Sequence, residues 1–217
     1  MGSMNSYKHV IWDWNGTLLD DALLCIEVLN GLLKSRGLES VTEEFYRTHF
    51  GFPVIEFYEF LGLETDPDGF DVISREFIGT YEERWLQECS LFPGTVDALV
   101  ALAECGMTHS VLSAAKQEAL HTGVTHYGLL EHFTELVGAD NIHARGKKER
   151  ALEWMTEFHW PPEEVVLIGD TLHDLEVAKA IEVDCILVAH GHHTPERLIA
   201  SGRPVAHSMA EVVEFLR

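Results

Sequence analysis

Several acidic side chains stand directly after short apolar runs of the sequence, in positions where they could bind a metal or attack an electrophile. Asp13 follows the run 8–12 and begins the turn-like segment 13–17. Asp170 and Asp174 follow the run 165–168. Carboxylates are preferred ligands of Mg²⁺, and a carboxylate can also act as a nucleophile. Either use requires the two segments to meet in the folded chain.

A hydroxyl and a lysine pair occupy comparable positions. Ser113 follows the apolar run 108–112, and Lys147 and Lys148 precede a helical pattern. Each feature has a simple structural explanation, because Asp and Ser often begin turns or helices and lysines often lie on solvated helix ends. The joint order of acid, hydroxyl, lysine and two acids is much rarer than any one of them. The combination therefore indicates one composite site.

The elements that must position these residues follow an alternating plan. Apolar runs at 8–12, 108–112, 165–168 and 185–188 predict buried strands. Helical patterns follow at 96–103, 114–121, 151–158 and 175–181. The alternation predicts an α/β fold, a three-layer α/β/α Rossmann-like parallel sheet with helices on both faces. In such sheets ligands bind beyond the carboxyl ends of the strands, where Asp13, Ser113 and Asp170 fall.

Residues 21–90 interrupt the alternation with several amphipathic helical patterns. One apolar and aromatic stripe is expected to be core; it comprises Phe70, Ile73, Phe77, Tyr81 and Trp85. It follows a break at Asp66-Pro67-Asp68-Gly69. We expect a core domain of residues 1–20 and 91–217 and a helical cap domain of residues 21–90, inserted after the first strand.

Composition narrows the class of protein. The 15 Lys and Arg against 36 Asp and Glu give a formal charge of −21, which disfavours nucleic acid and anionic membranes as partners. No apolar run approaches the roughly 18 to 20 residues of a membrane span, and the first residues lack the layout of a signal peptide. The four cysteines form no CxxC pair, which favours reduced thiols. A cytoplasmic monomer or homodimer is expected.

The combined motifs resemble those of the haloacid dehalogenase (HAD) superfamily. The segment 11–17, Ile-Trp-Asp-Trp-Asn-Gly-Thr, is similar to the first motif, and 111–113 to the second. Lys147 or Lys148 would be the third, and 168–174 the fourth. The resemblance covers nearly the whole chain, since the inserted helices are similar to the C1 cap of this superfamily. The likeness is greatest to the phosphoglycolate phosphatase-like subgroup.

This resemblance implies a Mg²⁺-dependent phosphatase that acts on a small phosphorylated metabolite. Asp13 would be the nucleophile and would form an aspartyl-phosphate intermediate. Mg²⁺ would be held by the Asp13 carboxylate, the backbone carbonyl of Asn15, and Asp170, with Asp174 supporting it directly or through water. A phosphate dianion repels a carboxylate, so such a site needs a cation.

The remaining motif residues would bind substrate. Ser113 and the lysine would contact the transferring oxygens, and Ala114, Gly16 and Thr17 are further candidates for substrate binding. We expect Lys147 rather than Lys148 to be the motif-three lysine, because it follows Gly146 where helical periodicity begins.

Asn15 departs from the pattern of the superfamily, whose phosphatases mostly carry Asp at this position to protonate the leaving group. Asn cannot do this, and proton transfer by a positioned group contributes roughly 10²–10⁴-fold. One hypothesis is a phosphatase for leaving groups that depart without protonation, or one whose proton comes from another residue or from water. The metal contact of Asn15 would survive, because it uses the main chain.

Two alternatives remain open. The chain could resemble phosphonoacetaldehyde hydrolase, which also lacks that acid and uses a cap lysine; Lys34 is the only lysine between residues 20 and 92. It could also be a non-catalytic protein that binds Mg²⁺ and phosphate. The loop with His190, His192 and His193 is interpreted as a polar rim of the site rather than a zinc site. The segment 49–53 is a candidate specificity element.

Overall fold

The main element of the computed structural model is a six-stranded parallel sheet in the order β5-β4-β1-β6-β7-β8. The structure describes residues 7–139 and 147–217. The strands are β1 (His9–Trp12), β4 (Thr108–Lys116), β5 (Glu135–Ala139), β6 (Val165–Gly169), β7 (Asp184–Val188) and β8 (Val205–Ala206). The parallel order confirms the predicted α/β class.

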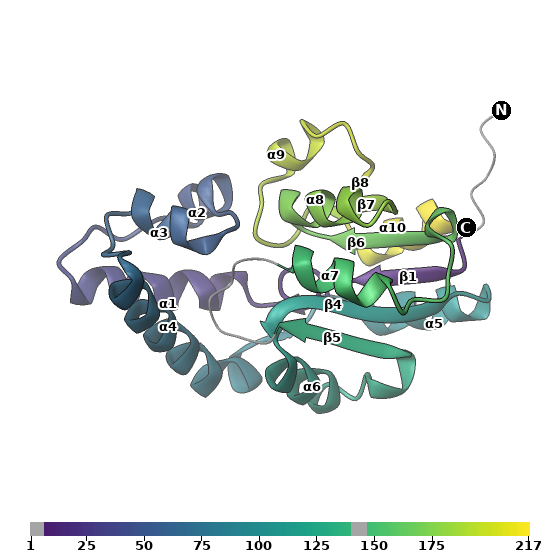
Figure 1. Cartoon of the computed structure of the whole chain (residues 1–217), viewed down its shortest axis with the longest axis horizontal. Helices are drawn as coiled ribbons and strands as arrows, with labels where there is room; N and C mark the ends of the chain where they lie inside the picture. Colours follow the sequence, from purple (N-terminus) through teal and green to yellow (C-terminus); the bar gives the residue numbers. More distant parts are fainter. Residues whose placement is uncertain (1–6, 140–146) are drawn as a thin grey trace.

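Helices cover both faces of this sheet (Figure 1). They are α5 (Thr95–Glu104), α6 (Gln117–His126), α7 (Lys148–Met155), α8 (Leu172–Ala180), α9 (Pro195–Ile199) and α10 (Met209–Leu216), with 3₁₀ turns η1 (Leu130–His132) and η2 (Pro162–Glu164). Val10 and Trp12 belong to the core cluster that includes α5 and α10, whereas Ile11 belongs to the cluster with α7 and α8. Because alternate side chains of a strand point to opposite faces, the predicted three layers are confirmed.

Four further helices follow the first strand: α1 (Ala22–Ser35), α2 (Glu43–His49), α3 (Val54–Phe60) and α4 (Pro67–Glu88). They enclose an apolar cluster of their own. A short antiparallel pair, β2 (Leu19–Asp20) and β3 (Ser90–Leu91), joins them to the sheet. In Figure 1 these helices lie beyond the arrowheads of β4 and β5, so they stand next to the carboxyl ends of the strands.

The segment 66–69, expected to be a break, is the beginning of α4. Asp66 is the N-cap, and its side chain accepts a hydrogen bond from Gly69 N at 2.7 Å. Pro67 occupies the first helical turn, where its missing N–H is not needed. The preceding helix α3 already ends at Phe60, so the predicted break is the capping segment with which α4 begins.

Other boundaries also differ from the prediction. β4 continues to Lys116, so Ala114, expected to begin a helix, lies in the strand, and α6 begins at Gln117. The edge strands β5 and β8 were not predicted, nor was α10. β8 is only two residues long, and β5 contains Gly138, so neither forms a continuous apolar run.

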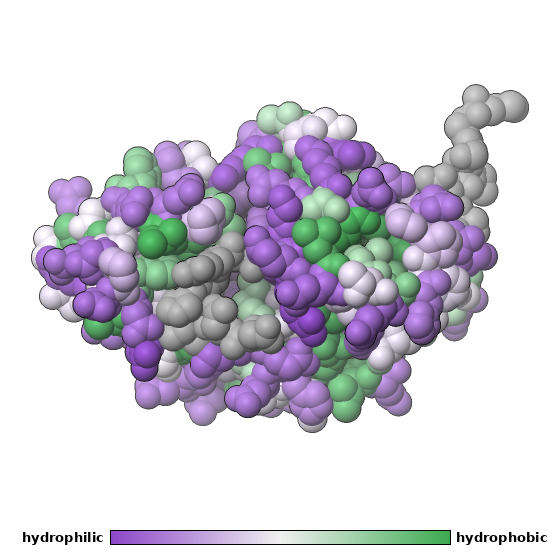
Figure 2. All heavy atoms as spheres, in the orientation of Figure 1, coloured by the Kyte–Doolittle hydropathy of each residue, from purple (hydrophilic) through white to green (hydrophobic). Residues whose placement is uncertain are grey.

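The face of the molecule in Figure 2 is largely hydrophilic, with one group of apolar residues to the right of its centre and smaller ones elsewhere. Within the described ranges, no helix combines the length and the apolar character needed to cross a membrane.

Candidate active site

The order of the strands brings the predicted site residues together. β1 lies between β4 and β6, and Asp13 and Asp170 directly follow β1 and β6. Ser113 lies within β4, two residues beyond Val111, the partner of Trp12 at the end of β1. The Asp13 amide continues the ladder by donating to Ile168 O at 2.9 Å. Residues separated by more than 150 positions therefore share one edge of the sheet.

Three buried carboxylates form the centre of this edge. One oxygen from each of Asp13, Asp170 and Asp174 lies within 4.8 Å of the others. The Thr17 hydroxyl lies 3.1 Å from an oxygen of Asp13 and 3.1 Å from an oxygen of Asp170. Asp174 also accepts hydrogen bonds from the backbone and hydroxyl of Thr171, at 2.9 and 2.7 Å. These bonds fix the carboxylates toward a common point.

Two glycines make this close approach possible. A Cβ on Gly16 would lie 2.3 Å from Asp170 Oδ2, and its φ of +73° is unfavourable for other residues. A Cβ on Gly169 would lie 2.1 Å from Asp174 Cγ. The glycines of the first and fourth motifs are therefore required by packing against the carboxylates.

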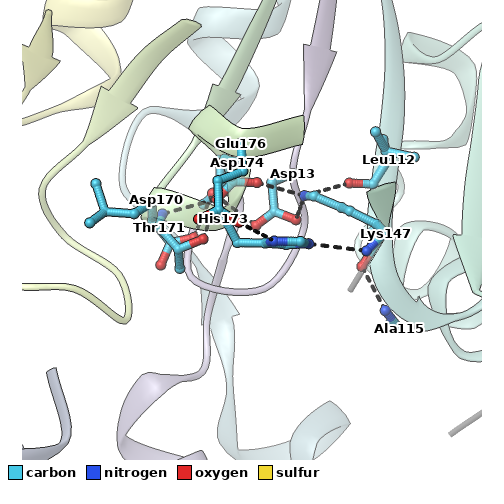
Figure 3. A network of polar contacts seen from close by, with 12 residues as sticks. Asp13, Leu112, Ala115, Lys147, Asp170, Thr171, His173, Asp174 and Glu176 are labelled. Atoms are coloured by element: carbon cyan, nitrogen blue, oxygen red, sulfur yellow. Dashed lines mark hydrogen bonds and ion pairs between the residues drawn. The ribbon is translucent and has the colours of Figure 1, made fainter. Parts of the chain in front are cut away.

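The Lys147 side chain extends into the same group (Figure 3). Its Nζ donates to Asp13 Oδ1 and to Leu112 O, the latter at 2.9 Å, and lies 2.7 Å from Asp174 Oδ1. Lys148 begins α7 and is exposed. Of the two lysines, Lys147 is thus the one that contacts the carboxylates.

Among the described residues this cluster is not electrically balanced, since one ammonium faces three carboxylates and the nearby His192 imidazole is paired with Asp21. Burial raises the pKa of Asp13 and of Asp170. Burial would do the same to Asp174, but the nearby Lys147 ammonium outweighs it and lowers the pKa of that carboxyl. A buried excess of negative charge of this kind favours a bound cation.

The predicted substrate-binding residues divide into two groups. Ser113 and Ala114 line a cavity that opens onto the carboxylates, and Ser113 Oγ accepts from Ala115 N at 3.0 Å. Gly16 and Thr17 are not among the residues lining it. The Gly16 amide lies 3.0 Å from Asp21 Oδ1, and Thr17 is fully buried against the carboxylates. In the structure these two positions pack against the carboxylates.

Asn15 belongs to a second buried polar network that the sequence did not reveal. Its Nδ2 donates to Asp21 Oδ2 at 2.7 Å and to the Tyr81 hydroxyl at 3.0 Å. His192 Nε2 lies 3.4 Å from Asp21 Oδ1. Burial would lower the pKa of His192, but the Asp21 carboxylate raises it to about 9. The only signal in the sequence was the acidic pair 20–21 at the start of a helix.

The histidine loop, interpreted as a polar rim of the site, does border the cavity through His192, but it is more enclosed than a rim: His192 and His193 are buried and His190 is partly buried. His192 Nδ1 lies 3.0 Å from the Tyr46 hydroxyl, and His193 Nε2 lies 3.0 Å from Phe50 O. Both histidines are almost inaccessible to solvent. They connect the loop after β7 to the α2 region of the cap, a contact between distant segments that no local pattern predicts.

Asp21, Cys25 and His192 also have ligand atoms within 4.8 Å of one another. Unlike the first cluster, this one pairs a carboxylate with an imidazole of raised pKa, and Asp21 accepts further bonds from Tyr81 and Asn15. Its charges and polar atoms are already matched by protein partners.

The cavity extends from the carboxylates to the side chains of α1 to α4, with a volume of about 180 Å³. Trp14, Phe50 and Phe52 line it, as do most members of the aromatic stripe of α4. That stripe was expected to be core. Ile73 and Phe70 do belong to the apolar cluster of the cap, but Phe70, Phe77, Tyr81 and Trp85 also face the cavity.

Comparison with protein families places these features in context. Residues 10–188 match the family model described as haloacid dehalogenase-like hydrolase. The chain belongs to this family. The match spans the first strand, the inserted helices and the fourth motif, so the HAD resemblance inferred from the motifs is confirmed.

Curated relatives of this HAD hydrolase include phosphatases. It is 23% identical over 221 residues to a phosphoglycolate phosphatase of Photobacterium profundum, covering 98% of this chain and 93% of the relative. It is 29% identical over 208 residues to the tyrosine-protein kinase PtkA of Mycobacterium tuberculosis, covering 95% and 70%. The family and the phosphatase relatives together identify this hydrolase as a phosphatase.

A solved structure of similar fold is the haloacid dehalogenase-like family hydrolase of Streptococcus pneumoniae. It superposes with a TM-score of 0.82 over 99% of this chain and 100% of the other, at 19% identity. At this identity the similarity concerns the fold, and it agrees with the sheet and helices described above.

Proposed function

We propose that this HAD phosphatase is a Mg²⁺-dependent phosphohydrolase that cleaves a small phosphorylated metabolite through an aspartyl-phosphate at Asp13. The observation that carries the proposal is the buried group of three carboxylates with a single lysine. In this proposal residues 1–20 and 91–217 form the catalytic core domain, and residues 21–90 form a cap domain over the substrate. The enzyme would act in the cytoplasm as a monomer or homodimer.

The residues present fit a hard divalent cation. Oxygen ligands from Asp13, Asp170 and Asp174 can reach a common point, and their excess negative charge is buried. The backbone carbonyl of Asn15 would complete the protein ligands, as the family motif implies. The bound ion would neutralise the phosphate and the nucleophile, which otherwise repel each other.

The chemistry of the chain's own residues follows from their positions. An oxygen of Asp13 attacks phosphorus, and the bond from phosphorus to the leaving oxygen breaks with its electron pair on the leaving group. Lys147 and the Ser113 hydroxyl bind the oxygens of the transferring group. Water then attacks the aspartyl-phosphate, releasing inorganic phosphate and restoring the Asp13 carboxylate.

Asn15 supplies no proton to the leaving group, so the enzyme would favour leaving groups that depart as anions. The alternative mechanism needs a lysine of the cap that forms a Schiff base with the substrate. Its candidate, Lys34, is exposed in the last turn of α1 and does not line the cavity, which disfavours this mechanism. Of the two mechanisms, that of a phosphatase without the usual general acid therefore agrees better with the residues of the site.

Phosphate release from p-nitrophenyl phosphate and acetyl phosphate, measured with Mg²⁺ and after chelation, tests the proposal. We expect turnover with the metal and a loss of at least about 10²-fold without it, because the buried carboxylates would again repel the substrate. Metal-dependent binding of phosphate without turnover of either compound would instead indicate a non-catalytic binding protein.

A further inference from the structure

The shape and lining of the cavity restrict the group that the phosphate is attached to. Beyond the carboxylates, the wall formed by the cap is aromatic, and it includes Phe57, Tyr58, Phe70, Phe77, Tyr81 and Trp85. The whole cavity, which also has to hold the phosphate, has a volume of about 180 Å³, of the same order as the roughly 150 Å³ of an apolar cavity that accepts benzene. The space suits one aromatic ring attached to the phosphate.

The scarcity of charged side chains in this wall of the cavity disfavours a polar or anionic leaving group. Among the lining residues of α1 to α4, all of which the structure describes, the only charged side chain is Glu82, which is exposed. Asp21, at the start of α1, is paired with His192. The cationic side chains among the lining residues, Lys116, Lys147 and His192, all lie outside α1 to α4, and His192 is already paired with Asp21. A carboxylate directed into the cap would therefore be desolvated without a partner.

The environment of Asn15 is a second, independent constraint on the leaving group of the substrate. Its amide hydrogens are directed to Asp21 and Tyr81, and the side chain has no dissociable proton to give. An alkoxide is a poor leaving group without protonation. A phenol, with a pKa of about 10 as in the tyrosine side chain, departs as its anion far more readily. An aromatic hydroxyl compound thus satisfies both the cavity and the chemistry.

We infer that the substrate is a small aryl phosphate, a phosphate monoester of an uncharged aromatic hydroxyl compound whose ring occupies the cap cavity. The inference rests on the proposed phosphohydrolase function. Asp13 attacks phosphorus, the bond to the aryl oxygen breaks, and the phenolate leaves with the electron pair and takes a proton from solvent. Water then cleaves the aspartyl-phosphate.

The test compares kcat/KM for phenyl phosphate, 4-carboxyphenyl phosphate, phosphoglycolate and acetyl phosphate with the Mg²⁺-loaded wild-type enzyme. Phenyl and 4-carboxyphenyl phosphate release phenols of similar acidity, so their ratio isolates the effect of the charge. We expect phenyl phosphate to be preferred over its carboxylate analogue and over phosphoglycolate by roughly tenfold or more. A preference for either carboxylate, which Lys116 could bind, would overturn the inference.

A pair of variants on one helix tests the position of the ring. Ser74 is buried and lines the cavity, whereas Thr80 is exposed on the same helix α4. We expect Ser74→Leu to lower the ratio of kcat/KM for phenyl over acetyl phosphate by about tenfold, since it fills space needed by the ring. Thr80→Leu should leave the ratio unchanged. An unchanged ratio in a folded Ser74→Leu variant would contradict the inference.

Different outcomes would exclude the phosphohydrolase function and the aryl phosphate substrate. If none of the four phosphates is hydrolysed, the proposed function is wrong. If 4-carboxyphenyl phosphate or phosphoglycolate is hydrolysed at least as efficiently as phenyl phosphate, the phosphohydrolase stands and the aryl substrate class is wrong.

Discussion

Two groups of buried polar side chains lie at opposite ends of β1, and they differ in how their charges are matched. At the amino end, His9 Nδ1 lies 2.7 Å from Thr108 Oγ1, and His9 Nε2 lies 2.8 Å from Ser110 Oγ. Burial lowers the pKa of His9 to about 4, so this group is neutral near pH 7. Both ring nitrogens have neutral hydroxyl partners.

At the carboxyl end of the same strand, Asp13 lies among two further carboxylates and a single lysine. Here the buried groups are ionic, and their charges do not cancel. Burying an unmatched charge is destabilising, so such an arrangement is maintained where a ligand supplies the missing charge. The comparison separates buried polar groups that support the fold from those that bind and react.

The largest expected effect on activity comes from removing the proposed nucleophile, Asp13, at the carboxyl end of β1. Asp13→Asn should reduce kcat for p-nitrophenyl phosphate by at least about 10³-fold, because no covalent intermediate can form. Acid quenching with a ³²P-labelled substrate should leave label on the wild-type protein and none on the variant. Retention of a tenth of the activity would exclude Asp13 as the nucleophile.

Lys147 and Lys148 form a matched pair for the next test. Lys147→Ala should lower kcat/KM by about 10²-fold, since it removes a buried cation that contacts Asp13 and Asp174. Lys148→Ala should change it by less than about twofold, because Lys148 is exposed. Similar losses in both variants would argue against a specific role for Lys147.

Asn15→Asp tests the missing general acid. The new carboxyl would face Asp21, whose Oδ2 lies 2.7 Å from Asn15 Nδ2, and the repulsion would keep one of the two protonated. We expect alkyl phosphates to be hydrolysed about 10²-fold faster, the lower end of the contribution of a general acid. The double variant Asn15→Asp and Asp21→Asn, which preserves one hydrogen bond, serves as the control. An unaltered alkyl phosphate rate in both would indicate another proton donor.

The smallest expected effect is on the stability of the fold, through the neutral His9 at the amino end of β1. The folded-state pKa of His9 lies below its ordinary value of 6.5, so its contribution is fully present above pH 6.5 and is lost as the pH falls toward 4. The loss should reach about 3 kcal/mol of the free energy of unfolding at pH 4. His109, also shifted to about 4, should add to it.

Urea denaturation between pH 8 and 4.5 would measure this loss. His9→Gln should flatten the dependence on pH, whereas His121→Gln, on the exposed face of α6, should not. Equal slopes in the wild type and His9→Gln would mean that His9 is not the group that titrates.

The group of carboxylates at the carboxyl end of β1 could be predicted largely from the sequence. Asp13 and Asp170 each follow an apolar run, and adjacency of their strands was enough to bring them together. The neighbouring polar network around Asp21 could not be predicted in this way. Asp21 contacts Asn15 through a turn, and His192 reaches Asp21 from a loop more than 170 residues away. Local patterns contain no information about such a contact.

The alternating apolar runs determined the parallel sheet, the inserted helices and the edge at which the carboxylates meet, because strand period and helix period are local properties of the chain. The sequence favoured Lys147 over Lys148, but only the tertiary structure showed that Lys147 contacts Asp13. The tertiary structure alone decided that Asn15 is held by Asp21 and Tyr81, and that part of an aromatic stripe faces a cavity. These outcomes depend on which distant surfaces pack together, and that is fixed only when the whole chain is folded.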